Sequence, residues 1–324
     1  MIRAYYKDRA FYVAEDFDQL ALEDAIWLDL YHPTADEERF LEDALGFKLP
    51  TREEMKDIEP SSRMYTEEGV HYMTASILYN GDTDAPQTTD VGFILHGHLL
   101  VTIRYADLKP FQLFQTYADK HTDLYRSGPA TLVSLLEAVV DRAAEVLERV
   151  GTTIDIVSVE VFARHQKAIK RRSDDEMERS LSEVALNKNL TVKVRDSLLS
   201  LGRVISFLSH TEEISHDKKL SEGLATVARD VHALADHTNF LTGNISFVLD
   251  ACLGFISIQQ NAIIKIFSIA AVVLLPPTLV ASIYGMNFKY MPELDMPYGY
   301  PIALGVMAVS ALTPYLWFKR RGWL

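Results

Sequence analysis

The sequence predicts an α/β (α+β) N-terminal domain, a long helical stalk and two C-terminal transmembrane helices. Three observations lead to this prediction: short β-rich runs in the first third, an unbroken seven-residue periodicity towards the end, and two long apolar runs after it. The 324 residues carry a net charge of −13, which disfavours nucleic-acid binding. The single cysteine, Cys252, excludes an intramolecular disulfide framework.

Two uncharged runs, residues 266–283 and 300–318, are candidate membrane spans. As helices they would be roughly 27 and 28 Å long, close to the roughly 30 Å hydrocarbon core of a bilayer. Buried helices of a globular core are the alternative, but such helices are rarely apolar on every side over five turns. We therefore expect two spans in a lipid bilayer.

The residues that flank the spans predict their orientation. Lys319, Arg320 and Arg321 follow the second span, whereas Lys289 is the only Lys or Arg between the two. The positive-inside rule places the C-terminus in the cytosol, and an even number of spans returns the N-terminus to the same side. The first residues show no secretory signal pattern. We expect a multi-pass membrane protein with both termini cytoplasmic.

A single long helix is expected over residues 218–283. Apolar or small residues recur along it at alternating steps of three and four, the period of a packed helical seam, and no proline interrupts it before Pro276. Upstream, Ser127-Gly128-Pro129 predicts one helix start and the capping box Ser173-Asp174-Asp175-Glu176 predicts another. We expect these two helices to form an antiparallel pair beside the long one.

The first 120 residues contain β-rich runs and two further helix starts. Thr34 and Thr51 each open a T-x-x-E capping box, which predicts a helix after each. His96-Gly97-His98 offers either two metal-ligating imidazoles or, more simply, a hairpin turn at Gly97. The expected strands cover residues 3–6, 10–14, 25–30, 70–79, 91–96 and 98–105.

One face of the first span carries most of its small polar side chains. Small residues let membrane helices pack closely, which is one interpretation. The other is that this face lines an aqueous path with apolar constrictions, and because two helices cannot enclose a pore, such a path requires a homo-oligomer. Pro276-Pro277 within the span either kinks it or turns freed carbonyls towards the lumen. The residues of the predicted pore stripe are Asn261, Ile264, Phe267, Ser268, Ala271, Leu275, Thr278 and Ser282.

The end of the first span carries the most specific motif. Tyr284-Gly285-Met286-Asn287 is followed within the loop by Met291-Pro292-Glu293-Leu294. YGMN and then MPEL, after the first of two C-terminal spans, resembles the CorA family of magnesium channels. The stretch from residue 261 to 324 is similar to the proteobacterial branch of that family.

This resemblance implies a funnel-shaped homopentameric channel in the inner (plasma) membrane. Each subunit would give its first span to the pore, and Gly285, Met286 and Asn287 would form the selectivity filter. Magnesium dehydrates reluctantly, so a filter of neutral oxygens that accepts the hydrated ion avoids the cost of stripping its waters. Asn287 would supply the side-chain oxygen. In the same comparison Asn261 and Thr278 match polar pore positions, and Ile264, Phe267 and Leu275 match apolar constrictions.

The resemblance also implies passive influx that is shut off from the cytosolic side. Two charges that move inward gain about 4.6 kcal/mol per roughly 100 mV of membrane potential, so no nucleotide is needed. Magnesium would be both the transported and the regulatory ion, bound between subunits to close the pore, with Co²⁺ and Ni²⁺ as further permeant ions. Candidate regulatory ligands are Asp230, Asp236 and Asp90, although each also suits an ordinary surface acid. Glu293 and Asp295 would concentrate cations at the outer mouth.

These expectations divide the chain into six segments. They are a cytosolic α/β domain (1–125), a cytosolic antiparallel helical pair (126–215), a stalk helix continuing into the pore-lining span (216–285), the external GMN/MPEL loop (286–299), the second span (300–318) and a basic cytosolic tail (319–324).

Two alternatives remain open. A related transporter of zinc or another divalent cation is one, although the pore contains no soft Cys/His cluster. The other is a membrane-anchored coiled-coil scaffold that conducts nothing. The sequence predicts neither an enzyme nor an organic cofactor, because it shows no arrangement of nucleophile, base and orienting group.

Overall fold

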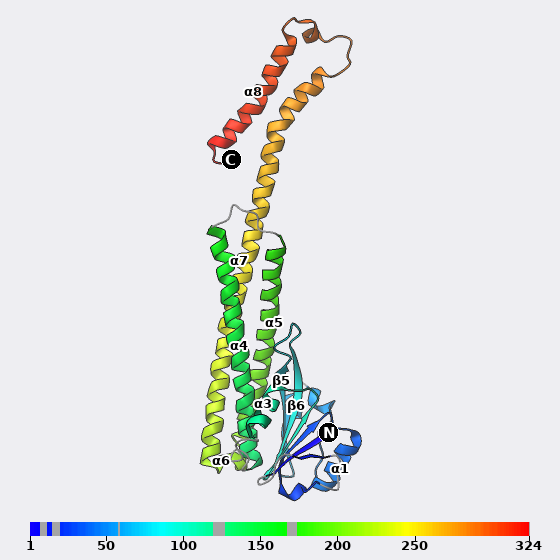
Figure 1. The fold of residues 1–324 in the computed structure, drawn as a ribbon, viewed down its shortest axis with the longest axis vertical. Helices are drawn as coiled ribbons and strands as arrows, with labels where there is room; N and C mark the ends of the chain where they lie inside the picture. Colours follow the sequence, from blue (N-terminus) through cyan, green and yellow to red (C-terminus); the bar gives the residue numbers. More distant parts are fainter. Residues whose placement is uncertain (7–11, 15–19, 58, 119–126, 167–173, 324) are drawn as a thin grey trace. The chain divides into compact units, whose positions relative to one another are not determined.

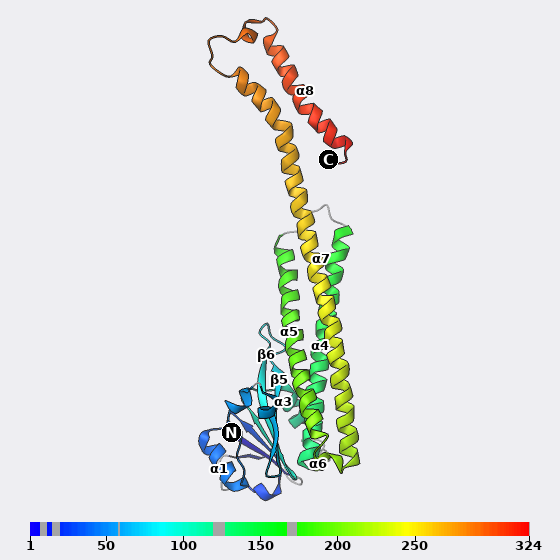
Figure 2. The same ribbon diagram turned by 180° about the vertical axis from the view of Figure 1, so that it is seen from behind.

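The computed structural model describes residues 1–324 apart from 7–11, 15–19, 58, 119–126, 167–173 and 324. The chain forms two compact units, Met1–Leu249 and Asp250–Leu324. The first unit contains a β-sheet with helices packed against it, and the second is helical (Figures 1 and 2). The sheet domain and the C-terminal apolar helices predicted from the sequence are both present.

The sheet has seven strands in the order β2-β1-β3-β7-β6-β5-β4. Neighbouring strands are antiparallel except β3 and β7, which are parallel and join the two halves of the sheet. The strands are β1 (Ile2–Tyr6), β2 (Tyr12–Ala14), β3 (Ala25–Tyr31), β4 (Met64–Glu67), β5 (Val70–Tyr79), β6 (Gln87–His96) and β7 (Leu99–Arg104). Six of these match expected runs, and β4 was not expected.

Two hairpins use backbone conformations that favour glycine. Gly97 has a φ of 53° in the turn between β6 and β7, where His96 pairs with Leu99. The hairpin interpretation of His96-Gly97-His98 is therefore confirmed, since a two-residue turn with glycine first needs this positive φ. Between β4 and β5, Glu68 and Gly69 have φ values of 49° and 80°.

The two capping boxes have different outcomes. Thr34 and Glu37 cap α1 (Ala35–Leu45) reciprocally, as the sequence predicts, and α1 ends at the left-handed Gly46. Thr51 and Glu54 make the same pair of hydrogen bonds, yet only a 3-10 turn, η3 (Glu54–Lys56), follows. The longer helix predicted there is wrong. The backbone is already extended at Asp57, and the next helix, α2 (Pro60–Arg63), begins with a proline, which disfavours a helical conformation in the residue before it.

The sheet holds a fully buried ion pair. Arg104 of β7 donates from Nε to Oδ1 of Asp29 at 3.0 Å and from Nη2 to Oδ2 at 2.9 Å, and both side chains are 0% exposed. Thr102 donates to Asp29 Oδ1, and Trp27 Nε1 donates to Thr102. Burial alone would lower the pKa of Arg104, but its hydrogen bonds to Asp29, together with the negative charges of Asp29 and Asp107, outweigh burial and raise the pKa. The network thus fixes the parallel pairing of β3 with β7.

Helices cover the face of the sheet that carries this network. The next elements are α3 (Lys109–Ala118), α4 (Gly128–Gln166), α5 (Asp174–Leu208), α6 (Glu212–Ser215) and α7 (Lys218–Tyr284). Within the first unit α4, α5 and the early part of α7 lie side by side (Figures 1 and 2). A side-chain carbon at Gly151 of α4 would lie 3.6 Å from Leu241 of α7, and one at Gly202 of α5 would lie 3.6 Å from Val231. The seam predicted for the long helix is therefore used against both partners. The capping box at Ser173 falls outside the described side chains.

The second unit consists of the remainder of α7, the 3-10 turn η5 (Pro292–Asp295) and α8 (Gly299–Arg320). The long helix was expected over residues 218–283 and ends one residue later, at Tyr284. Pro276 and Pro277 lie within it without ending it. The division of the whole chain into six segments stays a prediction.

Candidate ion pathway

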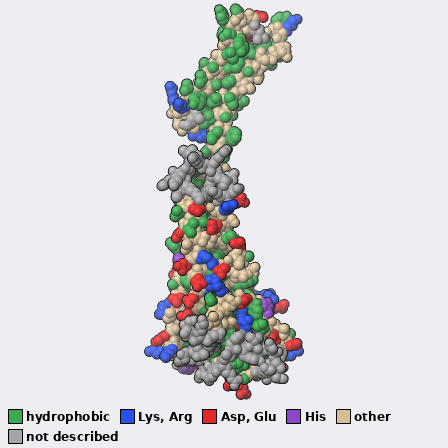
Figure 3. Space-filling view, viewed as in Figure 1, with side chains coloured by type: hydrophobic (Ala, Val, Ile, Leu, Met, Phe, Trp, Pro, Cys, Tyr) green, Lys and Arg blue, Asp and Glu red, His purple; other side chains and the backbone are tan. Residues whose placement is uncertain are grey.

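The helices of the second unit differ from core helices of a soluble domain in their exposure. The most apolar windows of α7 and α8 are long enough to cross a membrane, yet only 6% and 11% of them is buried. Hydrophobic side chains cover this hairpin, while Lys and Arg side chains gather at the end of α8 (Figure 3). A surface of this kind suits a hydrocarbon environment, because nothing else in this unit covers it among the described residues.

Contact with α8 occupies one side of α7. Ile269 of α7 is buried, as are Ala303 and Phe318 of α8, and Val273 and Val280 are half-buried. At about 100° of rotation per residue, Ile269, Val273 and Val280 lie within about 40° of one another around the helix axis. This side is a continuation of the seam predicted from the sequence.

The predicted pore stripe lies on the opposite side of α7. Counting about 100° per residue from Ile269, its members fall between about 160° and 280°, centred roughly half a turn from the α8 contact. All of them are exposed, with Phe267 at 72% and Leu275 at 64%. The stripe residues Asn261, Ile264, Phe267, Ser268, Ala271, Leu275, Thr278 and Ser282 therefore remain available to a surface outside this chain's own hairpin.

Thr278 shows how the stripe presents oxygen atoms. Its hydroxyl donates to the carbonyl of Leu274 at 2.7 Å, one turn earlier in α7. The proton is thereby used within the helix, so the lone pairs of the hydroxyl oxygen face outward as acceptors. Water molecules bound to a cation donate hydrogen bonds, so a path for a hydrated cation needs acceptor oxygens such as that of Thr278.

The motif at the end of α7 forms an exposed turn. The amide of Gly285 donates to the Ala281 carbonyl at 3.0 Å, and the amide of Met286 donates to the Ile283 carbonyl at 3.2 Å, which closes the helix. Asn287 follows outside the helix and is exposed. A side-chain carbon at Gly285 would lie 3.1 Å from the Ala281 carbonyl oxygen, so glycine suits this tight turn. Gly285, Met286 and Asn287 thus stand directly beyond the last residues of the stripe.

The second half of the loop is held by a close approach that the sequence analysis missed. Gly299 begins α8, and a side-chain carbon there would clash with the backbone carbonyl of Glu293. Glu293 and Asp295 both belong to η5 and are exposed. The MPEL segment is therefore packed backbone to backbone against the start of α8, and the carboxylates of Glu293 and Asp295 are exposed.

The candidate regulatory acids have unequal surroundings. Asp230 and Asp236 are exposed on α7, where Asp236 lies 3.9 Å from His232. Asp90 is instead engaged: its Oδ1 accepts from Arg63 at 2.7 Å and from Ser76 at 2.6 Å. Within the described part of the chain no group of three or more His, Cys, Asp or Glu side chains is arranged to hold a metal ion. The structure of one chain therefore brings none of the three candidates into a complete site.

Asp230 does belong to an acidic cluster that the sequence analysis did not find. Burial raises the pKa of Glu137 and of Asp141 on α4, and the negative charge of Asp230 on α7 raises both further. Glu137 and Asp141 fall one turn apart on the helix, and this spacing can be read from the sequence. That these two residues lie close to α7 cannot be read from the sequence. Carboxylates from two helices therefore repel one another at this point of the first unit.

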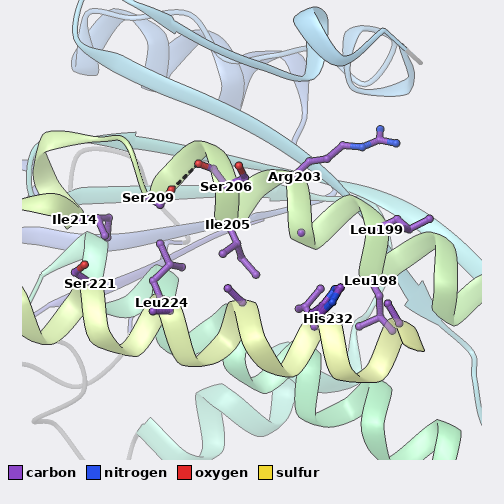
Figure 4. A pocket seen from close by; sticks show the side chains of 15 residues that line it. Leu198, Leu199, Arg203, Ile205, Ser206, Ser209, Ile214, Ser221, Leu224 and His232 are labelled. Carbon is purple, nitrogen blue, oxygen red and sulfur yellow. Dashed lines mark hydrogen bonds between the residues drawn. The ribbon is translucent and has the colours of Figure 1, made fainter. Parts of the chain in front are cut away.

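A groove of about 640 Å³ runs between α5 and α7 in the first unit. Ile205 of α5 and Leu224 of α7 point into it, whereas Arg203 points away (Figure 4). Further along α7 two aromatic side chains, Phe240 and Phe247, are each 61% exposed. Large apolar side chains exposed on a helix that already packs on two others indicate a further contact surface.

Comparison with known proteins agrees with this arrangement. The family model described as "CorA-like Mg2+ transporter protein" matches residues 23–320. The chain is 34% identical over 326 residues to the magnesium transport protein CorA of Haemophilus influenzae, covering 100% of both chains. It is also 34% identical over 304 residues to the protein of that name from Salmonella typhimurium, covering 94% of this chain and 93% of the other. These relatives are named as transport proteins rather than enzymes.

Solved structures share the fold over the full chain. The CorA magnesium transporter from Methanocaldococcus jannaschii has a TM-score of 0.77 at 19% identity and covers 100% of this chain and 99% of its own. The full-length CmaX protein has a TM-score of 0.69 at 14% identity, with coverages of 98% and 96%. Together with the two candidate spans and the family match over residues 23–320, these similarities show that the chain belongs to the CorA family.

Proposed function

We propose that this chain is the subunit of a magnesium channel that mediates passive, membrane-potential-driven Mg²⁺ influx. The observation that carries the proposal is the exposed stripe on α7, which lies away from α8 and leads into Gly285-Met286-Asn287. Relatives that are 34% identical over the whole chain are named as magnesium transport proteins, and this supports Mg²⁺ as the transported ion.

The pathway requires several copies of the chain. One α7–α8 hairpin cannot enclose water, so the stripes of neighbouring subunits must face a common axis. The groove between α5 and α7 and the exposed Phe240 and Phe247 provide further surface for a neighbouring copy. The resemblance of the YGMN and MPEL motifs to the CorA channels supports five copies. The assembly is therefore a homopentamer in the inner membrane, with both termini of each chain in the cytoplasm.

The chemistry of the stripe suits a hydrated divalent cation. Mg²⁺ holds its waters tightly and in octahedral geometry, so a path that keeps the ion hydrated avoids the dehydration cost. Asn287 offers an amide oxygen at the mouth, and Thr278 offers a hydroxyl oxygen whose proton is already donated to Leu274. Ile264, Phe267 and Leu275 narrow the path with apolar side chains that exclude water when they approach one another. Co²⁺ and Ni²⁺, which also carry octahedral water shells, pass by the same route.

Cytosolic Mg²⁺ closes this channel by binding between subunits. The acidic cluster of Glu137, Asp141 and Asp230 is under mutual repulsion, which a divalent cation would relieve. Asp230 and Asp236 are exposed on α7 and so remain open to a neighbouring subunit. Asp90 is the weakest of the three candidates, because Arg63 and Ser76 already engage its Oδ1.

The direct test is Mg²⁺ flux into liposomes that contain the purified full-length protein. We expect flux that rises with an inside-negative potential and falls when Mg²⁺ is present inside. Asn287→Ala should reduce flux by about tenfold or more, since a lost hydrogen bond to a charged group costs about 1.5–3 kcal/mol. Asn189→Ala, at an exposed asparagine of α5, is the matched control and should leave flux unchanged.

Three outcomes would contradict the proposal. A wild-type protein that conducts no divalent cation would indicate a scaffold, and flux of zinc without competition by magnesium would indicate a different transporter. Equal flux in the wild type and in Asn287→Ala would remove Asn287 from the pathway.

A further inference from the structure

The end of α8 and the facing part of α7 form a cluster of cations on an aromatic platform. The Lys265 ammonium of α7 lies 5.5 Å from the ring centre of Trp323, and the Arg321 guanidinium lies 5.2 Å from that of Trp317. Phe318 is buried between the two indoles, with ring centres 5.1 Å from Trp317 and 5.4 Å from Trp323. Lys319 and Arg320 directly precede Arg321, and Figure 3 shows Lys and Arg side chains gathered at this end of the hairpin.

Among the described residues of the second unit, no acidic side chain lies beside the four cations of this basic–aromatic cluster, Lys265, Lys319, Arg320 and Arg321. The acidic side chains of residues 250–324 are Asp250, Glu293 and Asp295. Asp250 precedes Lys265 by about 22 Å along the helix, and the other two lie in η5, beyond the opposite end of α8. Within the described residues none of the four cations makes an ion pair with a carboxylate. Four like charges with no described carboxylate beside them favour the binding of an anionic ligand.

The surroundings of the cluster select the kind of anion. Trp317 and Trp323 are about half exposed, at 52% and 48%, and amphipathic rings of this kind favour the boundary between headgroups and hydrocarbon. Apolar side chains are exposed on both helices next to the cations, including Ile266 at 66% and Leu316 at 51%. A ligand that presents a phosphate to the cations and acyl chains to these side chains matches both parts of the surface.

We propose that Lys265 and Arg321, supported by Lys319 and Arg320, bind the phosphate headgroup of an anionic phospholipid at this end of the hairpin. Lysine supplies a compact charge, and arginine, held over the Trp317 ring, supplies a planar set of donors for phosphate oxygens. Because Lys265 comes from α7 and Arg321 from the segment after α8, the bound lipid ties the pore-lining helix to its neighbour. The inference rests on the proposed function only in requiring that the hairpin spans a bilayer.

The test uses the two exposed indoles as reporters in the full-length protein. The protein is reconstituted into vesicles of phosphatidylcholine and phosphatidylglycerol in which one lipid at a time carries bromine on its acyl chains, which quenches tryptophan on contact. Trp27 is fully buried in the sheet and contributes a constant background. We expect stronger quenching by brominated phosphatidylglycerol than by brominated phosphatidylcholine. The preference should fall by about fivefold for each cation removed, in Lys265→Gln and in Arg321→Gln.

Lys289→Gln is the matched control, since it removes a cation from the loop at the other end of the hairpin, and it should keep the preference. Quenching by brominated phosphatidylcholine also reports whether each variant is inserted. Equal quenching by both lipids, or a preference that survives loss of Lys265 and Arg321, would overturn the lipid site and leave the proposed channel intact. Absence of quenching by either lipid would instead refute the membrane span. A preference removed by inorganic phosphate, but not by chloride of equal ionic strength, would identify a soluble anion and also overturn the lipid site.

Discussion

Removing Asp29 should strongly destabilise the sheet, because it leaves a charged guanidinium buried without its partner. Arg104 and Asp29 are both 0% exposed, and their contact is bidentate at 2.9 and 3.0 Å. Loss of one partner of such a pair costs about 3–5 kcal/mol. Among the described residues, the partners left to the guanidinium after Asp29→Ala are the Ala106 carbonyl, the carboxylate of Asp107 and the rings of Tyr31 and Phe111.

The assay is hydrogen exchange of the backbone amides of β3 and β7, followed by mass spectrometry on the purified full-length protein. At about 1.4 kcal/mol per decade, the expected loss corresponds to exchange faster by about two to four orders of magnitude. Asp107→Ala is the matched control: Asp107 also pairs with Arg104, at 3.5 Å, but its side chain is 54% exposed. We expect it to cost less than about 1 kcal/mol.

A double variant separates the lost partner from the lost volume. Asp29→Leu combined with Arg104→Met removes both charges, and replacement of a buried pair by apolar residues is often neutral or stabilising. The double variant should therefore exchange more slowly than Asp29→Ala. The reasoning would be refuted if Asp29→Ala cost no more than Asp107→Ala, or if the double variant were the least stable of the three.

Three further predictions concern the first unit. Gly128→Ala should lower the free energy of unfolding in urea by about 1–3 kcal/mol, since its new side-chain carbon would lie 2.6 Å from the His98 carbonyl oxygen. Gly243→Ala is the contrasting variant: no atom lies within 4 Å of its new carbon, so it should raise the free energy of unfolding by about 0.5–1 kcal/mol. The hydrogen bond from Arg149, with those from Arg142 and Lys109, lowers the pKa of Asp82 below 3.8. The ion pairs of Asp82 therefore stabilise the fold above that pH, and this stabilisation is lost on acidification. Asp82→Asn should remove the fall in melting temperature at low pH that comes from these pairs, and should cost less than about 1 kcal/mol near neutrality. Burial and then the charge of Asp230 raise the pKa of Asp141, so the ionised carboxylate destabilises the fold at neutral pH, and this cost is relieved as pH falls through the raised value. Asp230→Asn should therefore raise the melting temperature without Mg²⁺ and reduce the rise in melting temperature that added Mg²⁺ causes. A larger rise with Mg²⁺ in the variant would contradict a role for Asp230 in binding the ion.

Local signals predicted the elements of this fold better than its long-range pairings. The Thr34 capping box and the two-residue turn at Gly97 are complete within a few residues, and both were correct. The Thr51 box is equally local, but a helix must also continue beyond its first turn. The backbone leaves the helical conformation at Asp57, so no longer helix forms there. The parallel pairing of β3 with β7 could not be predicted, because it depends on Asp29 meeting Arg104 across 75 residues.

The candidate pathway shows the same division. The stripe was predicted from periodicity and the filter from the resemblance of the GMN motif, and the roles of both stay predictions. That α8 would contact the side of α7 opposite the stripe was not visible in the sequence, since α8 is apolar all round and shows no preferred face. The acidic cluster was missed because Glu137 and Asp141 meet Asp230 only through the packing of two helices.

The place where the first compact unit ends bears on how the protein is made. That unit is complete at Leu249, whereas the first uncharged run begins at Ile266. Domains form as the chain leaves the ribosome, N-terminal parts first, at about 5–20 residues per second. The sheet and its helices can thus fold in water before the first hydrophobic segment leaves the ribosome and reaches the translocon. Biogenesis is thereby divided into an aqueous step followed by a lipid step, and the buried Asp29–Arg104 pair is assembled in the first of them.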